Sequence, residues 1–238
     1  MNYKIIKDEK ELQKFIDWLP QLEDGQKFYV SLFARKKYSA TEGLKADKGQ
    51  LKRFTASKEQ MINKIKKLEV EVESYECDGI SVNQDSLVLY ITPNPRDMHR
   101  AGLKTIQELT KFLVDGKKIY NAQSTALNMI QVSGIKKYFD MDIDFRDGKG
   151  CSLENLYNWF WDNSIINSEA VVGNIVKTRG GFHVLVELDK ITEEYKKKWY
   201  NNFTNTKSDI FTVMANSDNM IPVPGCVQSN FSPILCQH

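Results

Sequence analysis

Residues Tyr138-Phe139-Asp140-Met141-Asp142-Ile143-Asp144-Phe145 alternate strictly between apolar or aromatic and acidic side chains from position 139 onward. A period of two is typical of a β-strand with one face on a hydrophobic core. The apolar side chains are expected to face that core, and Asp140, Asp142 and Asp144 to share the opposite face. Aspartate is depleted in strands, so this spacing favours a functional site over the alternative, a solvated acidic strand face.

Carboxylates on one face of a strand lie about 6–7 Å apart at the backbone and repel one another. Without a cation between them, at least one has a raised pKa. Two divalent cations about 3.5–4 Å apart would relieve the repulsion. The acidic face therefore predicts a site for two Mg²⁺ or Mn²⁺ ions. The residues alone leave open whether the pair is Asp140/Asp142 or Asp142/Asp144.

A second motif, Thr178-Arg179-Gly180-Gly181-Phe182-His183, lies between two predicted strands. Two glycines allow a tight turn with positive φ and let a ligand approach the backbone. Arg179, His183 and the backbone N–H groups of the turn would suit a nucleotide phosphate. The alternative is an ordinary hairpin whose histidine is a satisfied core residue.

A third acidic position precedes the last apolar stretch, which ends at Pro224-Gly225. Asp209 stands before this stretch, and Asp218 competes with it for the role of a third carboxylate. For both residues the alternative is an aspartate in a turn or at a helix end.

The order of the expected elements predicts the fold class. Expected helices are 8–19, a helix capped by Ser57, 97–114, 122–132, a helix capped by Ser152, and 191–202. Expected strands are 28–34, 86–91, 137–145, 170–177, 182–188 and the last apolar stretch, which ends at Pro224-Gly225, with a loop and a short edge element in 39–55. From about residue 136 the order is β-α-β-β-α-β. This predicts an α+β protein: an RRM-like split βαβ catalytic module, 136–238, with an N-terminal α/β module, 1–135, packed against it in one compact domain.

The first module contains a basic segment. Residues 31–53 hold seven Lys or Arg against two acidic residues, in a chain whose net charge is only +2. Basic residues interleaved with aromatics suit a nucleic-acid backbone with stacked bases. The predicted contacts are Arg35, Lys36, Lys52 and Arg53, together with Arg96 in a turn before a helix. The alternatives are a solvated basic loop and, for Arg96, a plain helix-capping turn.

Together and in this order, the three motifs resemble the catalytic core of the archaeo-eukaryotic primase superfamily, the primase-polymerases. That family has an acidic pair after an apolar run, then a Ser/Thr–Gly–x–His type segment entering a strand, then a third acidic residue. Residues 138–142, residues 178–183 and Asp209 match these motifs. Because the family places its first carboxylate directly after the apolar run, the resemblance favours the Asp140/Asp142 register.

The resemblance implies a template-dependent nucleotidyltransferase, a DNA primase or DNA polymerase. Asp140, Asp142 and Asp209 would hold two Mg²⁺ or Mn²⁺ ions, and Asp144 belongs to the other register. His183, with Thr178, Arg179, Gly180 and Gly181, would contact the nucleotide. The expected substrates are NTP or dNTP and a single-stranded DNA template. A separate helicase is an expected partner, because no helicase segment is recognised in the chain.

Composition and length exclude several other classes. The chain has 238 residues, of which 41% are apolar and 27% charged, as in globular proteins. It has no apolar run of membrane-spanning length, no N-terminal signal sequence and no C-x-x-C pair, so a cytoplasmic protein is expected, phage- and plasmid-encoded enzymes included. A metal-dependent nuclease and a non-catalytic nucleic-acid-binding module remain as alternatives. A relaxase is disfavoured, because the three histidines form no His-x-His pair.

Overall fold

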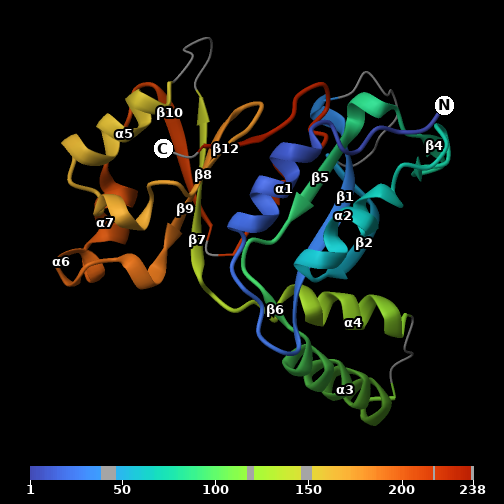
Figure 1. Ribbon diagram of the computed structural model, residues 1–238. Helices are drawn as coiled ribbons and strands as arrows, with labels where there is room; N and C mark the ends of the chain where they lie inside the picture. Colours follow the sequence, from blue (N-terminus) through green and yellow to red (C-terminus); the bar gives the residue numbers. More distant parts are fainter. Residues whose placement is uncertain (39–46, 117–120, 146–151, 217, 237–238) are drawn as a thin grey trace.

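The computed structural model describes residues 1–38, 47–116, 121–145, 152–216 and 218–236 (Figure 1). These residues form an α+β protein with two five-stranded antiparallel sheets and a two-stranded one. The N-terminal sheet has the strand order β11-β5-β1-β2, with β6 paired to β1. The C-terminal sheet has the order β10-β7-β9-β8-β12.

The N-terminal sheet is built around the long strand β1 (Gln26–Arg35). Its other strands are β2 (Lys48–Ala56), β5 (Leu87–Ile91), β6 (Arg96–Asp97) and β11 (Ile221–Pro222). Helices α1 (Glu9–Trp18) and α2 (Lys58–Lys66) cover one face, and Asp8 and Ser57 cap them. The capped helix at Ser57 and the strand over 28–34 are thereby confirmed. The edge element predicted within 39–55 is a full nine-residue strand, and residues 39–46 lie outside the described part.

Alternation along β1 gives the N-terminal sheet two different faces. Phe28, Val30 and Leu32 are fully buried in the core beneath α1 and α2. The intervening residues, among them Phe33 and Arg35, therefore point to the opposite face. That second face forms one wall of the site described below.

The C-terminal sheet has the order β-α-β-β-α-β along the chain, but its last strand is not the one expected. The apolar stretch that ends at Pro224-Gly225 contains β11, which pairs with the N-terminal sheet, and β10 takes its place. The elements in chain order are β7 (Tyr138–Phe145), α5 (Leu153–Asp162), β8 (Ile175–Lys177), β9 (Gly181–Glu187), α6 (Glu193–Lys196), α7 (Trp199–Asn205) and β10 (Phe211–Asn216), with β12 (Ile234–Cys236) added at the edge. Helices α5 and α7 pack on the outer face of the sheet through Phe160 and Phe203. The α+β class predicted from the sequence is confirmed.

Two of the predicted elements differ in detail. The helix expected over 191–202 is two short helices, α6 and α7, because the chain turns at Lys197 and Lys198. The strand expected over 170–177 starts only at Ile175, and a 3₁₀ turn, η3 (Ser168–Ala170), precedes it. Ser152 caps α5 as predicted, with its side chain accepting a hydrogen bond from the Asn155 N–H.

The segment that follows β10 joins both sheets. Within it β11 pairs with β5 of the N-terminal sheet, whereas β12 pairs with β8 of the C-terminal sheet. Helix α1, which covers the N-terminal sheet, also contacts the C-terminal sheet. Trp18 donates a hydrogen bond to Asn174, just before β8, and Lys14 donates one to the Leu235 carbonyl in β12. Residues before and after the expected boundary at 135/136 form different sheets up to the end of β10. After β10 the chain returns to the N-terminal sheet through β11.

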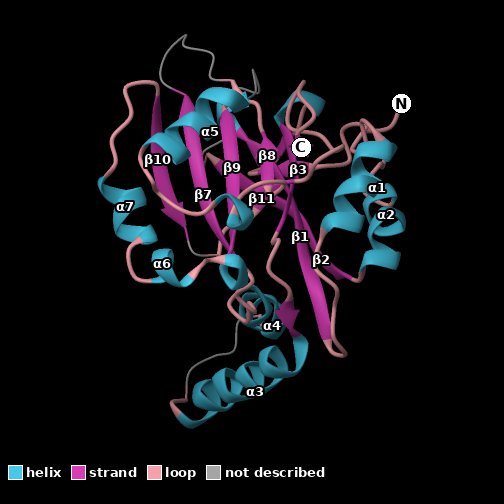
Figure 2. Ribbon diagram, turned by 60° about the vertical axis from the view of Figure 1, so that its left-hand side comes forward, coloured by secondary structure: helices cyan, strands magenta, loops and turns pink. Residues whose placement is uncertain are grey.

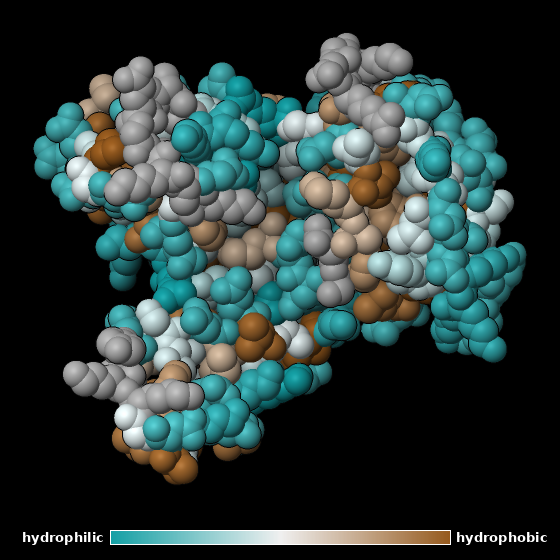
Figure 3. All heavy atoms as spheres, turned by 180° about the vertical axis from the view of Figure 1, so that it is seen from behind, coloured by the Kyte–Doolittle hydropathy of each residue, from teal (hydrophilic) through white to brown (hydrophobic). Residues whose placement is uncertain are grey.

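A helical hairpin stands apart from both sheets (Figure 2). It consists of α3 (Met98–Val114) and α4 (Ala122–Gln131), in agreement with the two helices predicted there. The outer surface of α3 exposes Leu103, Ile106 and Leu113, and Figure 3 shows apolar side chains on this projecting arm. None of the described helices has the length and apolar character needed to cross a bilayer.

The remaining elements are small. A two-stranded hairpin is formed by β3 (Glu76–Cys77) and β4 (Ile80–Ser81). Three further 3₁₀ turns are η1 (Lys36–Tyr38), η2 (Gln84–Ser86) and η4 (Leu188–Lys190). Of these, η1 follows β1 directly and carries Lys37 and Tyr38 to the cavity described below.

Candidate nucleotide and metal site

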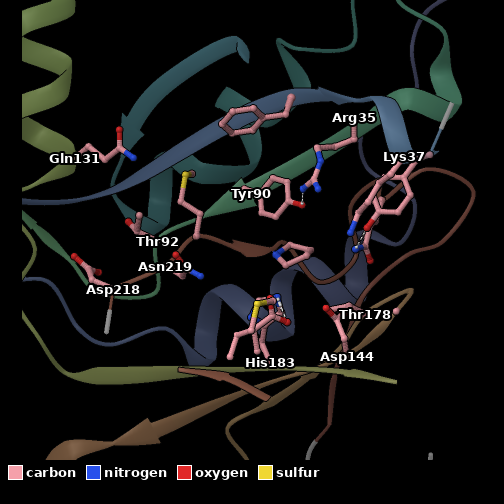
Figure 4. Close-up of a pocket in the computed structure, with 18 of the residues that line it drawn as sticks. Arg35, Lys37, Tyr90, Thr92, Gln131, Asp144, Thr178, His183, Asp218 and Asn219 are labelled. Carbon is pink, nitrogen blue, oxygen red and sulfur yellow. Dashed lines mark hydrogen bonds and ion pairs between the residues drawn. The ribbon is translucent and has the colours of Figure 1, made fainter. Parts of the chain in front are cut away.

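A cavity of about 430 Å³ lies between the inner face of the C-terminal sheet and the second face of the N-terminal sheet (Figure 4). The C-terminal sheet contributes Asp142, Asp144 and His183 to its lining. The N-terminal sheet contributes Phe33, Arg35 and Tyr90, and η1 adds Lys37 and Tyr38. Acidic groups from one sheet therefore face basic and aromatic groups from the other.

The alternation predicted for residues 138–145 positions the acidic groups. Met141 and Ile143 are fully buried in the core under α5 and α7. Asp142 and Asp144 consequently point the other way, into the cavity. Across the antiparallel ladder, Asp142 stands opposite His183 on β9, and Asp144 stands opposite Gly181.

Asp140 and His183 form a buried pair. His183 Nδ1 lies 2.9 and 3.1 Å from the two carboxylate oxygens of Asp140, and the residues are 7% and 2% exposed. Burial by itself lowers the pKa of His183. The charge and hydrogen bond of Asp140, and to a smaller extent the charges of Asp142 and Asp144, raise this pKa to about 9. The imidazole is therefore protonated at neutral pH, and its Nε2 lies 3.7 Å from Asp142 Oδ1.

The carboxylates of β7 that line the cavity are thus Asp142 and Asp144. The resemblance favoured the register Asp140/Asp142, but both oxygens of Asp140 are turned toward His183 and the residue does not line the cavity. Burial and the charge of Asp142 raise the pKa of Asp144, while Lys37 and His183 oppose this shift. Burial is the larger cause of this shift, and the repulsion from Asp142, the smaller one, is the part that a bound cation would relieve.

The donor set fits a divalent cation shared with a substrate. Within the part of the chain that the structure describes, no group of three or more His, Cys, Asp or Glu side chains is arranged to hold a metal ion by itself. Mg²⁺, however, is commonly bound by one or two carboxylates together with substrate phosphates and water. Asp142 and Asp144 supply these two hard oxygen ligands on one face of β7.

The two candidates for a third carboxylate are separated by the fold. Asp209 lies beside a different cavity, with Phe203, Lys207 and Phe211, and is not brought to Asp142 and Asp144. Asp218 does reach the lining of the main cavity. Its carboxylate is held there by Arg96, whose guanidinium nitrogens lie 2.5 and 3.0 Å from it, and by the Asn94 side chain at 3.1 Å.

The turn that precedes β9 is closed by its own hydrogen bonds. The Thr178 N–H donates to the Gly181 carbonyl at 2.8 Å, and the Gly181 N–H donates to Thr178 Oγ1 at 3.1 Å. Neither Gly180 nor Gly181 has the positive φ expected from the sequence. Gly181 is required instead by close approach, since a Cβ there would lie 1.8 Å from the Ile143 carbonyl oxygen. A Cβ on Gly180 would lie 3.4 Å from Asp144 Oδ1, so this glycine borders the acidic pair.

The basic wall gathers around the ring of Tyr38. Arg179 Cζ lies 4.9 Å, Lys37 Nζ 5.0 Å and Arg35 Cζ 5.7 Å from the ring centroid. Such cation–π contacts hold positive charges near one another at modest energy. Arg35 is further fixed by Asp47 and by the Tyr90 hydroxyl, at 2.9 and 2.7 Å.

Two residues of the site carried no functional signal in the sequence. Tyr90 lies in an ordinary apolar strand, yet its hydroxyl accepts a hydrogen bond from Arg35 and lines the cavity. Burial raises its pKa to about 12, so the hydroxyl stays protonated. Gln228 is 3% exposed and reaches both Tyr38 and the backbone of Arg179. Only its position just after Pro224-Gly225 could have drawn attention to it.

The residues predicted to contact nucleic acid differ in their exposure to solvent and in their hydrogen-bond partners. Lys36 and Lys52 are exposed. Arg53 reaches across to α4, where Ser124 and Asn128 accept its hydrogen bonds at 3.3 and 3.4 Å. Arg96 is 1% exposed and paired with Asp218, and it lies in the lining of the main cavity and not on an open surface. Its ion pair with Asp218 links the start of α3 to the segment after β10.

The cavity therefore combines the two carboxylates of β7, a protonated histidine, the Arg96–Asp218 ion pair and cations around one tyrosine. Comparison of the chain with protein-family models, with curated proteins and with solved structures finds no match.

Proposed function

We propose that this chain is a template-dependent nucleotidyltransferase, a DNA primase or DNA polymerase that uses nucleoside triphosphates and Mg²⁺ or Mn²⁺. The observation that carries the proposal is the arrangement of charge in one cavity. Asp142 and Asp144 lie on one wall, and Arg35 and Lys37 lie on the other. A metal–triphosphate complex needs both walls, because the cations neutralise phosphate oxygens while the carboxylates hold the metal.

The topology of the C-terminal module supports the resemblance to primase-polymerases. Its strand order β10-β7-β9-β8, with every neighbouring pair antiparallel, is the order expected of a split βαβ, RRM-like module, and so supports this part of the proposal. The acidic pair lies on the central strand β7, and His183 lies on its neighbour β9. Two of the three motifs identified in the sequence thus meet at one cavity.

Each group has a physical role in this proposal. Bound divalent cations would activate the attacking 3′-hydroxyl and stabilise the pyrophosphate leaving group. Asp142 and Asp144 would bind these cations from the wall of the cavity that the C-terminal sheet forms. Asp140 keeps His183 charged and fixed in orientation, so that His183 Nε2 can donate to a phosphate oxygen. Lys37 and Arg179 supply positive charge to the far end of the triphosphate.

The template would be a single strand of DNA held by the basic surface next to the cavity. Lys36 follows the pocket-lining Arg35 directly in the chain, and Lys52 extends positive charge along β2. Exposed lysines bind phosphates without reading sequence. This placement suits an enzyme that copies any template, and a helicase as a separate partner remains part of the proposal.

The test is nucleotide incorporation on a single-stranded DNA template, with and without a primer, in Mg²⁺ or Mn²⁺. We expect incorporation by the wild type and a loss of at least 100-fold in Asp142→Asn and in Asp144→Asn, because each variant removes a charged metal ligand. Asp189→Asn is the matched control, since Asp189 is exposed in η4 at the opposite end of β9 from the turn. Products formed without a primer would make the enzyme a primase.

Other outcomes would replace the proposal. Cleavage of DNA without added triphosphates, lost in the same two variants, would identify a metal-dependent nuclease. DNA binding that survives both chelation and Asp142→Asn, with no incorporation under any condition, would identify a non-catalytic nucleic-acid-binding module.

A further inference from the structure

We propose that Gln228 is a positioning residue that sets the basic end of the cavity for a triphosphate. This inference rests on the proposed function, since it concerns the phosphate-binding end of the same site. Gln228 itself does not need to touch the substrate. It acts through Arg179 and Tyr38, to which its side chain is hydrogen-bonded.

The contacts of Gln228 join three separate parts of the fold. Its Oε1 accepts the backbone N–H of Arg179 at 2.9 Å, in the turn of the C-terminal sheet. Its Nε2 donates to the Tyr38 hydroxyl at 3.2 Å, in η1 of the N-terminal sheet. Its own backbone N–H donates to the Phe231 carbonyl, and the next residue donates to the Leu87 carbonyl, which anchors the segment on β5. One side chain thus fixes the distance between the two walls.

The burial of Gln228 makes this arrangement sensitive to substitution. At 3% exposure its amide is removed from water, and its carbonyl oxygen and its amide nitrogen each have a partner. A buried amide with partners on both sides specifies one geometry, because either group left unpaired is unfavourable. An apolar side chain of similar size would leave the Arg179 N–H and the Tyr38 hydroxyl without these partners.

What Gln228 holds in place is a set of like charges. The Tyr38 ring has Arg179 and Lys37 within about 5 Å of its centroid, and Arg35 only slightly farther away. Asp47 balances Arg35, and Asp144 acts on Lys37 from across the cavity, so a multiply charged anion would add the remaining negative charge. Arg35, Lys37 and Tyr38 line the same cavity as Asp142 and Asp144. A triphosphate can contact both groups of charges, and a monophosphate is too short to gain from both equally.

The experiment compares ATP and AMP binding, by isothermal titration calorimetry with Mg²⁺, in the wild type and in two variants. Gln228→Leu removes both hydrogen bonds, and Tyr38→Phe removes only the hydroxyl while it keeps the ring. We expect ATP affinity to fall about tenfold in Gln228→Leu and about threefold in Tyr38→Phe. AMP affinity should change by less than twofold to threefold in both.

A matched control and a kinetic readout separate positioning from general damage. Gln26→Leu removes a buried glutamine at the opposite end of β1 from Arg35, whose amide also has two partners, the Glu23 N–H and the Glu23 carboxylate. It should leave ATP affinity unchanged. In the incorporation assay, Gln228→Leu should raise KM about tenfold and leave kcat within about twofold.

The outcomes distinguish this inference from the proposed function. If the wild type incorporates nucleotides and both variants bind ATP as tightly as it does, Gln228 has no positioning role and the proposed function stands. Equal losses for ATP and AMP would show a general structural effect and would also overturn the inference. If the wild type neither binds ATP nor incorporates nucleotides, the proposed function fails and this inference fails with it. Circular dichroism melts identify a variant that is unfolded, in which case Tyr38→Phe decides.

Discussion

Replacing Asp140 by asparagine should flatten the pH dependence of the free energy of unfolding between pH 6.5 and pH 9. Asp140 and His183 are almost completely buried and in direct contact. Burial alone would lower the pKa of His183, and Asp140 is the largest influence that raises it to about 9. Asparagine has nearly the same shape as aspartate but carries no charge, so it should let that pKa fall toward its ordinary value.

The magnitude follows from the two pKa values of His183. They are 6.5 in the unfolded chain and about 9 in the folded protein. Each pH unit of difference is worth about 1.4 kcal/mol, so the pair contributes about 3 kcal/mol. Because the folded-state pKa is the higher one, this stability is fully present below pH 6.5. It decreases as the pH rises and is lost once the pH passes about 9.

The assay is urea unfolding followed by circular dichroism at pH 6, 7.5 and 9, in EDTA so that no metal ion contributes. The wild type should lose about 3 kcal/mol over this range through His183. Asp140→Asn should lose less than half of that, and His183→Gln, which removes the titrating group, should behave similarly.

Asp218→Asn is the matched control, because it breaks another largely buried ion pair, with Arg96, that contains no histidine. It should lower stability at every pH and leave the slope unchanged. A slope in Asp140→Asn equal to that of the wild type would refute the assignment of a protonated His183 held by Asp140.

Four further outcomes are expected. Asp209→Asn should keep incorporation within about twofold of the wild type, because Asp209 lines a separate cavity; a 100-fold loss would mean that it reaches the metal site during the reaction. Gly181→Ala should destabilise the fold by about 3 kcal/mol in urea unfolding, because its Cβ would overlap the Ile143 carbonyl; Gly180→Ala should cost less than 1 kcal/mol there. Ile106→Lys should change the free energy of unfolding by no more than about 0.5 kcal/mol, since Ile106 is 65% exposed on α3; a larger change would show that this face is covered. Mn²⁺ alone should raise the melting temperature by less than Mn²⁺ with ATP, because the chain supplies only two carboxylate ligands; an equal rise would indicate a complete metal site without substrate.

Local patterns were sufficient to predict most of the elements. The period of two in residues 138–145 identified β7 and both of its faces, because side-chain alternation is a property of the extended backbone itself. Ser57 and Ser152 identified helix starts for a similar reason, since a cap satisfies N–H groups only a few residues away. The helix over 191–202 was predicted less well, because local periodicity does not show where a chain turns between two short helices.

The candidate site was predicted only in part. Asp142, Asp144, His183 and the turn before β9 were identified from their spacing and do meet at one cavity. The register of the acidic pair was not identified. It depends on which aspartate is hydrogen-bonded to His183, and Asp140 and His183 are 43 residues apart in the chain. The burial of Arg96 could not be foreseen either, since its partner Asp218 is 122 residues away.

The sequence by itself determined the α+β class, the acidic face of one strand and the concentration of positive charge in 31–53. These features follow from short-range periodicity and composition. Only the tertiary structure decided that Asp140 orients His183 while Asp142 and Asp144 line the cavity. It also decided that Gln228 meets Tyr38 across 190 residues of chain. The physical reason is that burial and hydrogen bonding between distant segments depend on how the two sheets pack, which no local pattern encodes.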